Sequence, residues 1–355
     1  MKVINLALLG TAALVAASIG ARAENLDALK TQMDTLTLNA VADAPAAATT
    51  TIVWTGYVRG GVSTFYDKTK AAGLQYFTDI RTKAGFKVVG TTDTAIGEIG
   101  VRIATQATFD EGTGVTNAGN GAISTDGYFG YWKLTPNVQL GAGVDGSLGK
   151  TGQGFDAKCS TAYVSCFGGI SNNPGGDPAQ IRLSYADGPL SFAIAVEDSN
   201  NATILVPNNA SAVGVAARAS YSADMFTGDL GGGYWGNAIG PESAWVVSGG
   251  IGANFGIASL SVGAGIGSGF AVGDDYTAVS ALMNLKLGDT AHVELGAGHK
   301  WNTSPGAGAA DFTTLGAGLY YDPVKQLTIG AEAAYITGGP TDGSYGVGLF
   351  TVFRF

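Results

Sequence analysis

Residues 345–355, YGVGLFTVFRF, alternate between two kinds of side chain, and this pattern limits the possible fold more than any other feature. A period of two over this length is the repeat of a β-strand. About ten residues tilted at roughly 45° are what a strand needs to cross the hydrocarbon core of a bilayer. One face is apolar apart from a single Thr and is aromatic at both ends, as in a strand that faces lipid between two interfaces. That face is Tyr345, Val347, Leu349, Thr351, Phe353 and Phe355. The alternative is a buried edge strand of a soluble β-protein, so the rest of the chain has to repeat the pattern.

Composition supports a membrane barrel. The chain has no run of eighteen apolar residues beyond its first twenty or so positions, which excludes helical membrane spans. Gly accounts for 56 of 355 residues, more than twice its usual share of about 7% and without a collagen period. Only 13% of the residues are charged. We therefore predict one all-β domain at 52–355, a transmembrane antiparallel β-barrel of about 16 strands.

Charge and cysteine content limit the partners and cofactors. The formal net charge is −9, and losing Lys2 and Arg22 with a leader brings it to −11. With no basic stripe in the sequence, we expect no nucleic-acid partner. Cys159 and Cys166 have no further metal-ligand residues gathered around them, so we expect a local disulfide rather than a zinc site, and no cofactor.

The first 51 residues differ from the rest. Residues 1–23 read as a secretory signal peptide with a positive start at Lys2, an apolar stretch and an Ala-Arg-Ala cleavage site at 21–23. An uncleaved anchor is the alternative. Residues 24–40 carry a heptad-like apolar seam that predicts a short helix, either a coiled-coil periplasmic stalk, an ordinary amphipathic helix or a flexible leader. Residues 41–51 are a small-residue linker, which completes the segment 24–51.

From residue 52 onward, strands with one apolar and one charged face follow one another. The first three begin near Ile52, Gln75 and Ala95, and charges of both signs recur on one face of each. A soluble sandwich would turn that face to solvent, whereas a barrel turns it into a wet lumen. The other thirteen strands are predicted at roughly 127–134, 137–145, 179–187, 190–198, 211–222, 227–238, 243–254, 257–269, 274–287, 290–302, 311–321, 326–337 and 345–355.

The connections alternate between tight turns and longer polar loops, which predicts the orientation. Short turns belong to the periplasmic side of such barrels and long loops to the outside. Both chain ends then lie in the periplasm. The expected periplasmic aromatic girdle is Trp54, Tyr185, Tyr221, Tyr321, Phe353 and Phe355, and the expected outer one is Tyr66, Tyr76, Tyr335 and Tyr345.

The longest connection, residues 146–178, is the candidate functional loop. A barrel of this width leaves an aqueous channel, and unstructured loops of this length are usually functional. We expect the loop to fold inward as a constriction stiffened by Cys159–Cys166, although it could merely cover the mouth. A basic wall facing its acidic residues would produce a transverse field that favours polar solutes. The candidate pore residues are Arg59, Asp79, Arg81, Lys83, Glu98, Arg102, Asp145, Asp156, Arg182 and Arg218. Each arginine has local pairing as its alternative, for example Arg81 with Glu98 or Asp79.

Short motifs carry a family resemblance. The start TGYVRGG at 55–61, the Asp79–Lys83 stretch, the long third loop and the Phe353-Arg354-Phe355 end resemble alphaproteobacterial outer-membrane porins of the general-diffusion type. The resemblance implies homotrimers of sixteen-stranded barrels in a Gram-negative outer membrane, each with its own water-filled pore. Arg59, Arg81 and Lys83 would line that pore, and a terminal Phe355 would be recognised by the barrel-assembly machinery. Outer-membrane lipids and lipopolysaccharide are the other expected partners.

The alternatives to passive diffusion of small hydrophilic solutes and ions are an enzyme, a structural anchor and a substrate-specific channel. An enzyme is disfavoured because no G-x-S-x-G motif occurs, and His292 and His299 are assigned to the inward face as lumen lining. A structural anchor to the periplasm could coexist with a pore. A substrate-specific channel needs a track of lumen aromatics, and Tyr57, Phe77 and Phe350 look too scattered to form one.

Overall fold

The computed structural model describes residues 49–110, 123–149, 177–198, 213–239, 242–268, 275–302, 311–339 and 342–355. The predicted signal peptide, the helix at 24–40 and most of the linker lie outside these residues. The chain divides into two units, and the larger one, 50–92 with 97–355, is the barrel described below. Within the described residues, no helix is long and apolar enough to cross a membrane.

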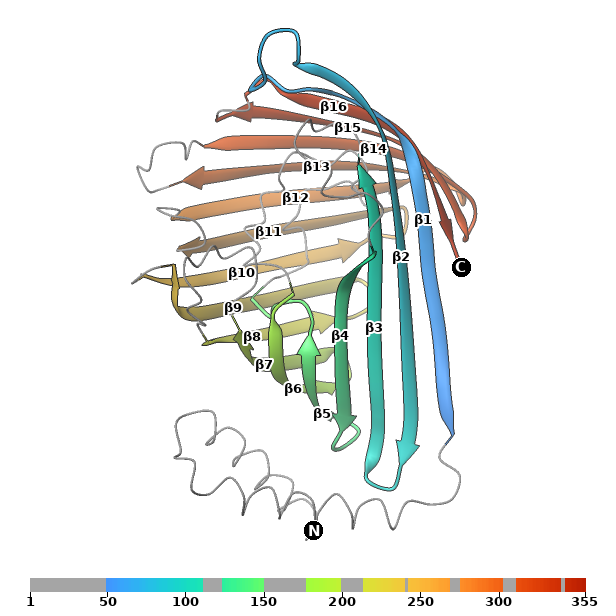
Figure 1. Cartoon of the computed structure of the whole chain (residues 1–355), viewed down its shortest axis with the longest axis vertical. Coiled ribbons are helices and arrows are strands. Elements are labelled where there is room, and N and C mark those ends of the chain that lie inside the picture. Colours follow the sequence, from blue (N-terminus) through green and yellow to red (C-terminus); the bar gives the residue numbers. More distant parts are fainter. Residues whose placement is uncertain are drawn as a thin grey trace. The chain divides into compact units, whose positions relative to one another are not determined.

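Sixteen antiparallel strands form one closed barrel in which each strand pairs with its neighbours in the sequence (Figure 1). Strand β1 pairs with both β2 and β16, which closes the wall. The strands are β1 Thr50–Tyr66, β2 Tyr76–Thr94, β3 Gly97–Asp110, β4 Ile123–Lys133, β5 Val138–Val144, β6 Ala179–Asp187, β7 Leu190–Asp198, β8 Val213–Ser222, β9 Phe226–Ile239, β10 Glu242–Asn254, β11 Ala258–Ser268, β12 Tyr276–Lys286, β13 Ala291–Asn302, β14 Phe312–Val324, β15 Leu327–Gly338 and β16 Tyr345–Arg354. The predicted fold class is confirmed.

The predicted and observed strand boundaries differ at β4 for a reason that the structure shows. This strand begins at Ile123, four residues before the predicted start at 127. Its pairing with β3 shifts register between Ala104 and Thr105, and Gly127 has a φ of +129° at this irregularity. A bulge of this kind moves side chains from one face to the other. The alternation across Gly127 is therefore interrupted, and residues 123–126 did not read as part of the strand.

The terminal strand β16 has the two faces that its sequence predicts. Leu349 and Phe353 are 68% and 57% exposed, whereas Phe350 and Val352 on the other face are only 3% and 4% exposed. Large apolar side chains are exposed on every strand of the barrel apart from β5, and on most strands they recur at alternate positions. An exposed apolar band around a closed barrel is the surface of a protein that crosses a membrane with strands. The soluble sandwich is excluded because its apolar face would be buried.

The barrel has two different ends. At one end, which we call the turn end, connections are short, and Gly188, Gly256 and Gly288 supply the positive φ that tight turns require. The first residue of β1, Thr50, and the last residue of β16, Arg354, also lie at this end. The remaining connections join the strands at the other end, which we call the loop end, and residues 67–75 between β1 and β2 are one that the structure describes in full.

Aromatic side chains mark both ends of the apolar band. At the loop end, Tyr335 pairs with Tyr345, Tyr345 with Tyr66, and Tyr66 with Tyr76, so the four predicted tyrosines form one row across four strands. The Tyr66 ring centroid lies 5.4 Å from that of Tyr345 and 4.8 Å from that of Tyr76. The six aromatics predicted for the turn end are all exposed on the outer face. The residues predicted for the two girdles therefore lie on the outer face near opposite ends of the barrel.

Candidate functional site: the lumen wall and the start of the third loop

Asp145 fastens the start of the third loop (residues 146–178) to the lumen wall. Its carboxylate forms ion pairs with Arg102 of β3 and with Nη1 of Arg182 of β6, the latter at 3.2 Å. Arg182 also donates from Nη2 to the Gly146 carbonyl at 2.8 Å and from Nε to Oε1 of Gln180 at 2.9 Å. Gln180 in turn donates to the Asp145 carbonyl at 2.6 Å. Three predicted pore residues, Arg102, Asp145 and Arg182, thus lie together.

The next residues of the loop cross to other strands. Glu197 of β7 is fully buried, and its carboxylate accepts hydrogen bonds from the Ser147 hydroxyl at 2.7 Å and the Leu148 N–H at 2.9 Å. The Ser248 hydroxyl of β10 donates to the Gly149 carbonyl at 3.2 Å. Strands β6 to β9 separate β10 from β5 around the wall. Residues 145–149 therefore run along the inner side of the wall rather than away from it.

Leu148 adds apolar packing to these hydrogen bonds. It is 5% exposed and belongs to a buried cluster with Trp235, Val246, Tyr276 and other inward-facing residues of β7 to β12. A buried Leu contributes about 1.5–3 kcal/mol relative to an exposed one. Sequence reasoning missed Glu197 and Ser248 as anchors, although both lie on the inward-facing positions of their strands.

Arg59 and Lys83 are directly opposite one another on β1 and β2, and both belong to the inward set. Asp126 of β4 interacts electrostatically with Lys83. Asp79, on the same face of β2, is 4% exposed. Arg81 pairs with Gly61 in the register, and its side chain lies outside the described part of the structure. Of the cations predicted for the first two strands, Arg59 and Lys83 thus lie side by side on the inward face.

Several predicted cations are paired with acids, which corrects the simple picture of a basic wall facing an acidic loop. Arg218 of β8 forms an ion pair with Asp229 of β9. Glu98 accepts a hydrogen bond from the Tyr131 hydroxyl and lies 2.8 Å from Nζ of Lys133. Because Asp145 lies between two arginines, it belongs to the wall itself. Asp156, Cys159 and Cys166 lie outside the described residues, so the acidic centre of the loop and its disulfide stay predictions.

Strands β13 to β15, on the other side of β16 from β1, carry a second polar network that the sequence reasoning missed. His292 lies 3.3 Å from Asp322 and 3.9 Å from Glu294, and its ring stacks on Tyr320 at 4.7 Å. The Tyr320 hydroxyl donates to Glu332 at 2.9 Å. All these residues occupy inward-facing positions. The alternation of side chains along each strand could therefore have identified them from the sequence. Among the described residues, no group of three or more His, Cys, Asp or Glu side chains has a geometry that could hold a metal ion.

Two smaller predictions are wrong. His292 and His299 were both predicted to face inward, but they lie seven positions apart on β13 and therefore face opposite sides. The ring centroid of His299 lies 4.3 Å from that of the exposed Trp301. Tyr57, Phe77 and Phe350 are not scattered, because they gather with Phe65 and Tyr320 into one inward cluster. Phe65, Tyr320 and Phe350 are at most 5% exposed, so their rings pack on one another and offer no open stacking track.

Comparisons with known proteins place the fold. No protein-family model matches the sequence, and no curated protein matches it either. Solved structures do. An anion-selective porin from Comamonas acidovorans aligns with a TM-score of 0.62 and 15% identity over 86% of this chain and 100% of that one. A mutant porin from Rh. blastica aligns at 0.55 with 18% identity over the same shares. A loop-deletion mutant of OmpT, an outer membrane protein of Vibrio cholerae, aligns at 0.58 with 12% identity over 86% and 99%. At these identities the likeness establishes the fold, which is the sixteen-stranded barrel of bacterial porins.

Proposed function

We propose that this protein is an outer-membrane porin, a water-filled channel for passive diffusion of small hydrophilic solutes and ions. A sixteen-stranded barrel is too wide for its own side chains to fill. The inward positions carry charged residues of both signs, as expected of a wet lumen and not of a packed core. The porin fold of the solved relatives supports the same function.

In this proposal the third loop folds inward and narrows the channel. The single observation that carries it is the anchoring of residues 145–149 by Glu197 and Ser248, which keeps the chain on the inner side of the wall as the loop begins. From there, residues 150–176 would enter the lumen and present Asp156, with Cys159–Cys166 as a stiffening disulfide. The turn end would be periplasmic and the loop end external.

The proposed assembly is a homotrimer in the outer membrane, surrounded by lipids and lipopolysaccharide and inserted by the barrel-assembly machinery at the Phe355 end. No catalytic role is proposed. Single-channel conductance of the purified protein in a planar bilayer under a salt gradient tests the function. Steps in groups of three, with a reversal potential, are expected. Insertion without conductance would contradict the porin proposal.

The constriction has its own test in the same bilayer. Ser248→Ala removes the donor to Gly149, and Glu197→Gln removes the charge that accepts from Ser147 and Leu148. Both changes loosen the loop from the wall, so single-channel conductance is expected to rise or to fluctuate. Ser261→Ala, at an inward-facing position of neighbouring β11, is the matched control and should conduct like the wild type. Identical conductance in all three variants would show that the loop does not narrow the pore.

A further inference from the structure

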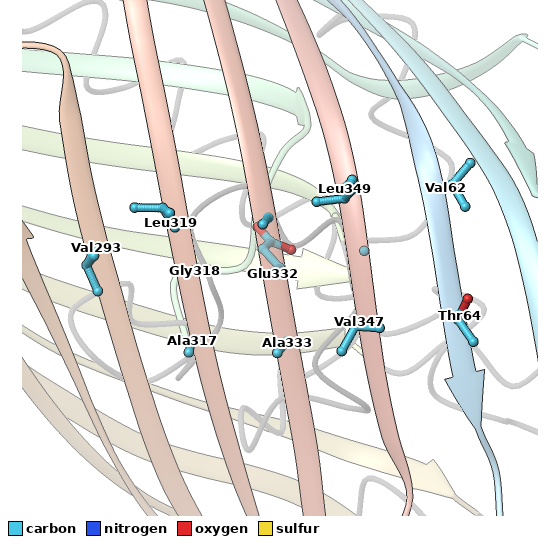
Figure 2. A pocket seen from close by; sticks show the side chains of 12 residues that line it. Val62, Thr64, Val293, Ala317, Gly318, Leu319, Glu332, Ala333, Val347 and Leu349 are labelled. Carbon is cyan, nitrogen blue, oxygen red and sulfur yellow. The ribbon is translucent and has the colours of Figure 1, made fainter.

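The outer wall of the barrel carries a groove that the channel function does not use. It has a volume of about 650 Å³ and is lined by residues of β13 to β16 and β1 (Figure 2). This volume falls within the roughly 300–1,000 Å³ range of small-molecule sites. Val62, Val293, Leu319, Val347 and Leu349 lie on the exposed face of their strands, so the groove opens toward the membrane and not the lumen.

The floor of the groove consists of small side chains. Ala317 of β14 lies opposite Ala333 of β15, and Ala331 lies two residues from Ala333 on the same face. Leu319 stands on one side of these alanines, and Leu349, which is 68% exposed, stands on the other. One-carbon side chains between four-carbon ones leave a trough, because Leu319 and Leu349, the two register partners of Ala331, rise above it.

The height of the groove in the membrane follows from the strand register. Val347 and Ala333 lie one outward position below Tyr345 and Tyr335, two members of the tyrosine row. Tyrosines at such a row sit at the level of lipid headgroups, with their rings amphipathic between hydrocarbon and water. The trough therefore begins directly beneath the interface at the loop end, where the first methylenes of an acyl chain lie.

We propose that this groove binds one acyl chain of a membrane lipid in the leaflet at the loop end. The trough is continuous with the lipid-facing band of the barrel, so hydrocarbon chains already surround it. A flexible chain can follow a trough of this volume, whereas a second barrel would present a convex wall that leaves it unfilled. The site selects hydrocarbon and not a headgroup, because its lining side chains are Ala, Val, Leu and one Thr; the sole charged residue among the lining positions, Glu332, directs its carboxylate to Tyr320.

Native mass spectrometry of the detergent-solubilised full chain tests the proposal, with dimyristoyl phosphatidylglycerol as the probe. Wild type is expected to retain lipid at a ratio of one per chain. The double variant Ala331→Leu with Ala333→Leu fills the trough and should lower retention by about tenfold, the equivalent of losing roughly two buried methylenes. Ala264→Leu, at an exposed outward position of β11, is the matched control and should retain as much lipid as wild type.

Two further arms keep the outcomes separate. Dimyristoyl phosphatidylethanolamine should be retained as well as the phosphatidylglycerol, and a strong headgroup preference would overturn the acyl-chain site. Leu349→Ala, which removes one wall without adding volume, should also reduce retention. If the double variant loses trimers while lipid retention is unchanged, a second copy of the chain occupies the groove and the proposal is wrong. Bilayer conductance measured on the same samples is expected to stay at the wild-type value, so failure here is distinct from failure of the channel function.

Discussion

The guanidinium of Arg182 on β6 lies 3.2 Å, from Nη1 to Oδ2, from Asp145, the residue that leads into the third loop. The same side chain donates to the Gly146 carbonyl and to Gln180, while Arg102 holds the other Asp145 oxygen. One arginine thus ties a strand, a carboxylate and the loop backbone together. Arg182 is 17% exposed, so these contacts are largely shielded from bulk water.

Arg182→Lys tests whether this geometry, and not charge alone, holds the loop base. A lysine keeps the charge but cannot donate to three separate acceptors from a planar fork. We expect the variant to lose about 1.5–3 kcal/mol of unfolding free energy, measured by urea unfolding in micelles, and to give noisier single-channel currents. Arg354→Lys is the control, because its Nη1 donates one hydrogen bond to the Thr328 hydroxyl at 2.6 Å and a lysine can replace that donor. Equal noise and stability in both variants would refute the role given to Arg182.

The cross-strand pair of Arg59 and Lys83 predicts a change in ion selectivity. Both side chains belong to the inward face of the wall, and like charges directly opposite one another are destabilising. Arg59→Gln with Lys83→Gln should move the reversal potential under a salt gradient toward cation preference, since a cationic wall attracts anions. It should leave barrel stability equal or slightly higher. Lys325→Gln, in an exposed turn between β14 and β15, is the control and should leave the reversal potential unchanged.

The barrel could be predicted from the sequence because its signal is repeated on strand after strand. The alternation in 345–355 was sufficient for one strand, and the turns at Gly188, Gly256 and Gly288 set the next boundaries. The tyrosine row was also predictable, because residues from separate strands had to fall at one height. Where a bulge interrupts alternation, as at Gly127, the boundary was missed.

The lumen site was less predictable because pairing across strands depends on register. Arg218 could be placed on the inward face, but its partner Asp229 depends on how β8 aligns with β9 in a Gly-rich stretch. Glu197 was missed for a different reason, since its partners Ser147 and Leu148 come from a loop and not from a neighbouring strand. The alternation of side chains alone would have placed His299 on the outer face, because it is an odd number of residues from the inward-facing His292.

The loop between β15 and β16 predicts a pH-dependent stability. The Gly338 N–H and the Thr337 hydroxyl donate to Asp342, and with Lys68 nearby they hold the pKa of its carboxyl below the usual value. A depressed pKa stabilises the folded state above the unfolded pKa of about 3.9, and this contribution disappears as the pH falls through the folded pKa. Asp342→Asn should therefore differ from wild type in thermal midpoint above about pH 5, and the difference should shrink below pH ~3.9. Asp289→Asn, in an exposed turn at the other end, is the control, and a pH-independent difference for Asp342→Asn would contradict the linkage.

Closure of the barrel between β1 and β16 depends on a glycine. A Cβ at Gly61 would collide with the Leu349 carbonyl and with the backbone of Phe350, its register partner. Backbone atoms cannot move aside as a side-chain tip can, so Gly61→Ala forces the two strands apart at the point where the wall closes. Overpacking of this kind costs about 1–3 kcal/mol and occasionally more. We expect a smaller fraction of the heat-resistant, fast-migrating barrel in gel mobility assays after refolding into micelles. Gly90→Ala is the matched control because a Cβ at Gly90 meets no atom within 4 Å.

The two main-chain hydrogen bonds between Gly56 and Phe355, at 3.2 and 3.1 Å, complete the seam between β1 and β16. Deleting Phe355 should therefore reduce barrel yield in the same assay, and normal yields for both variants would show that the seam tolerates separation.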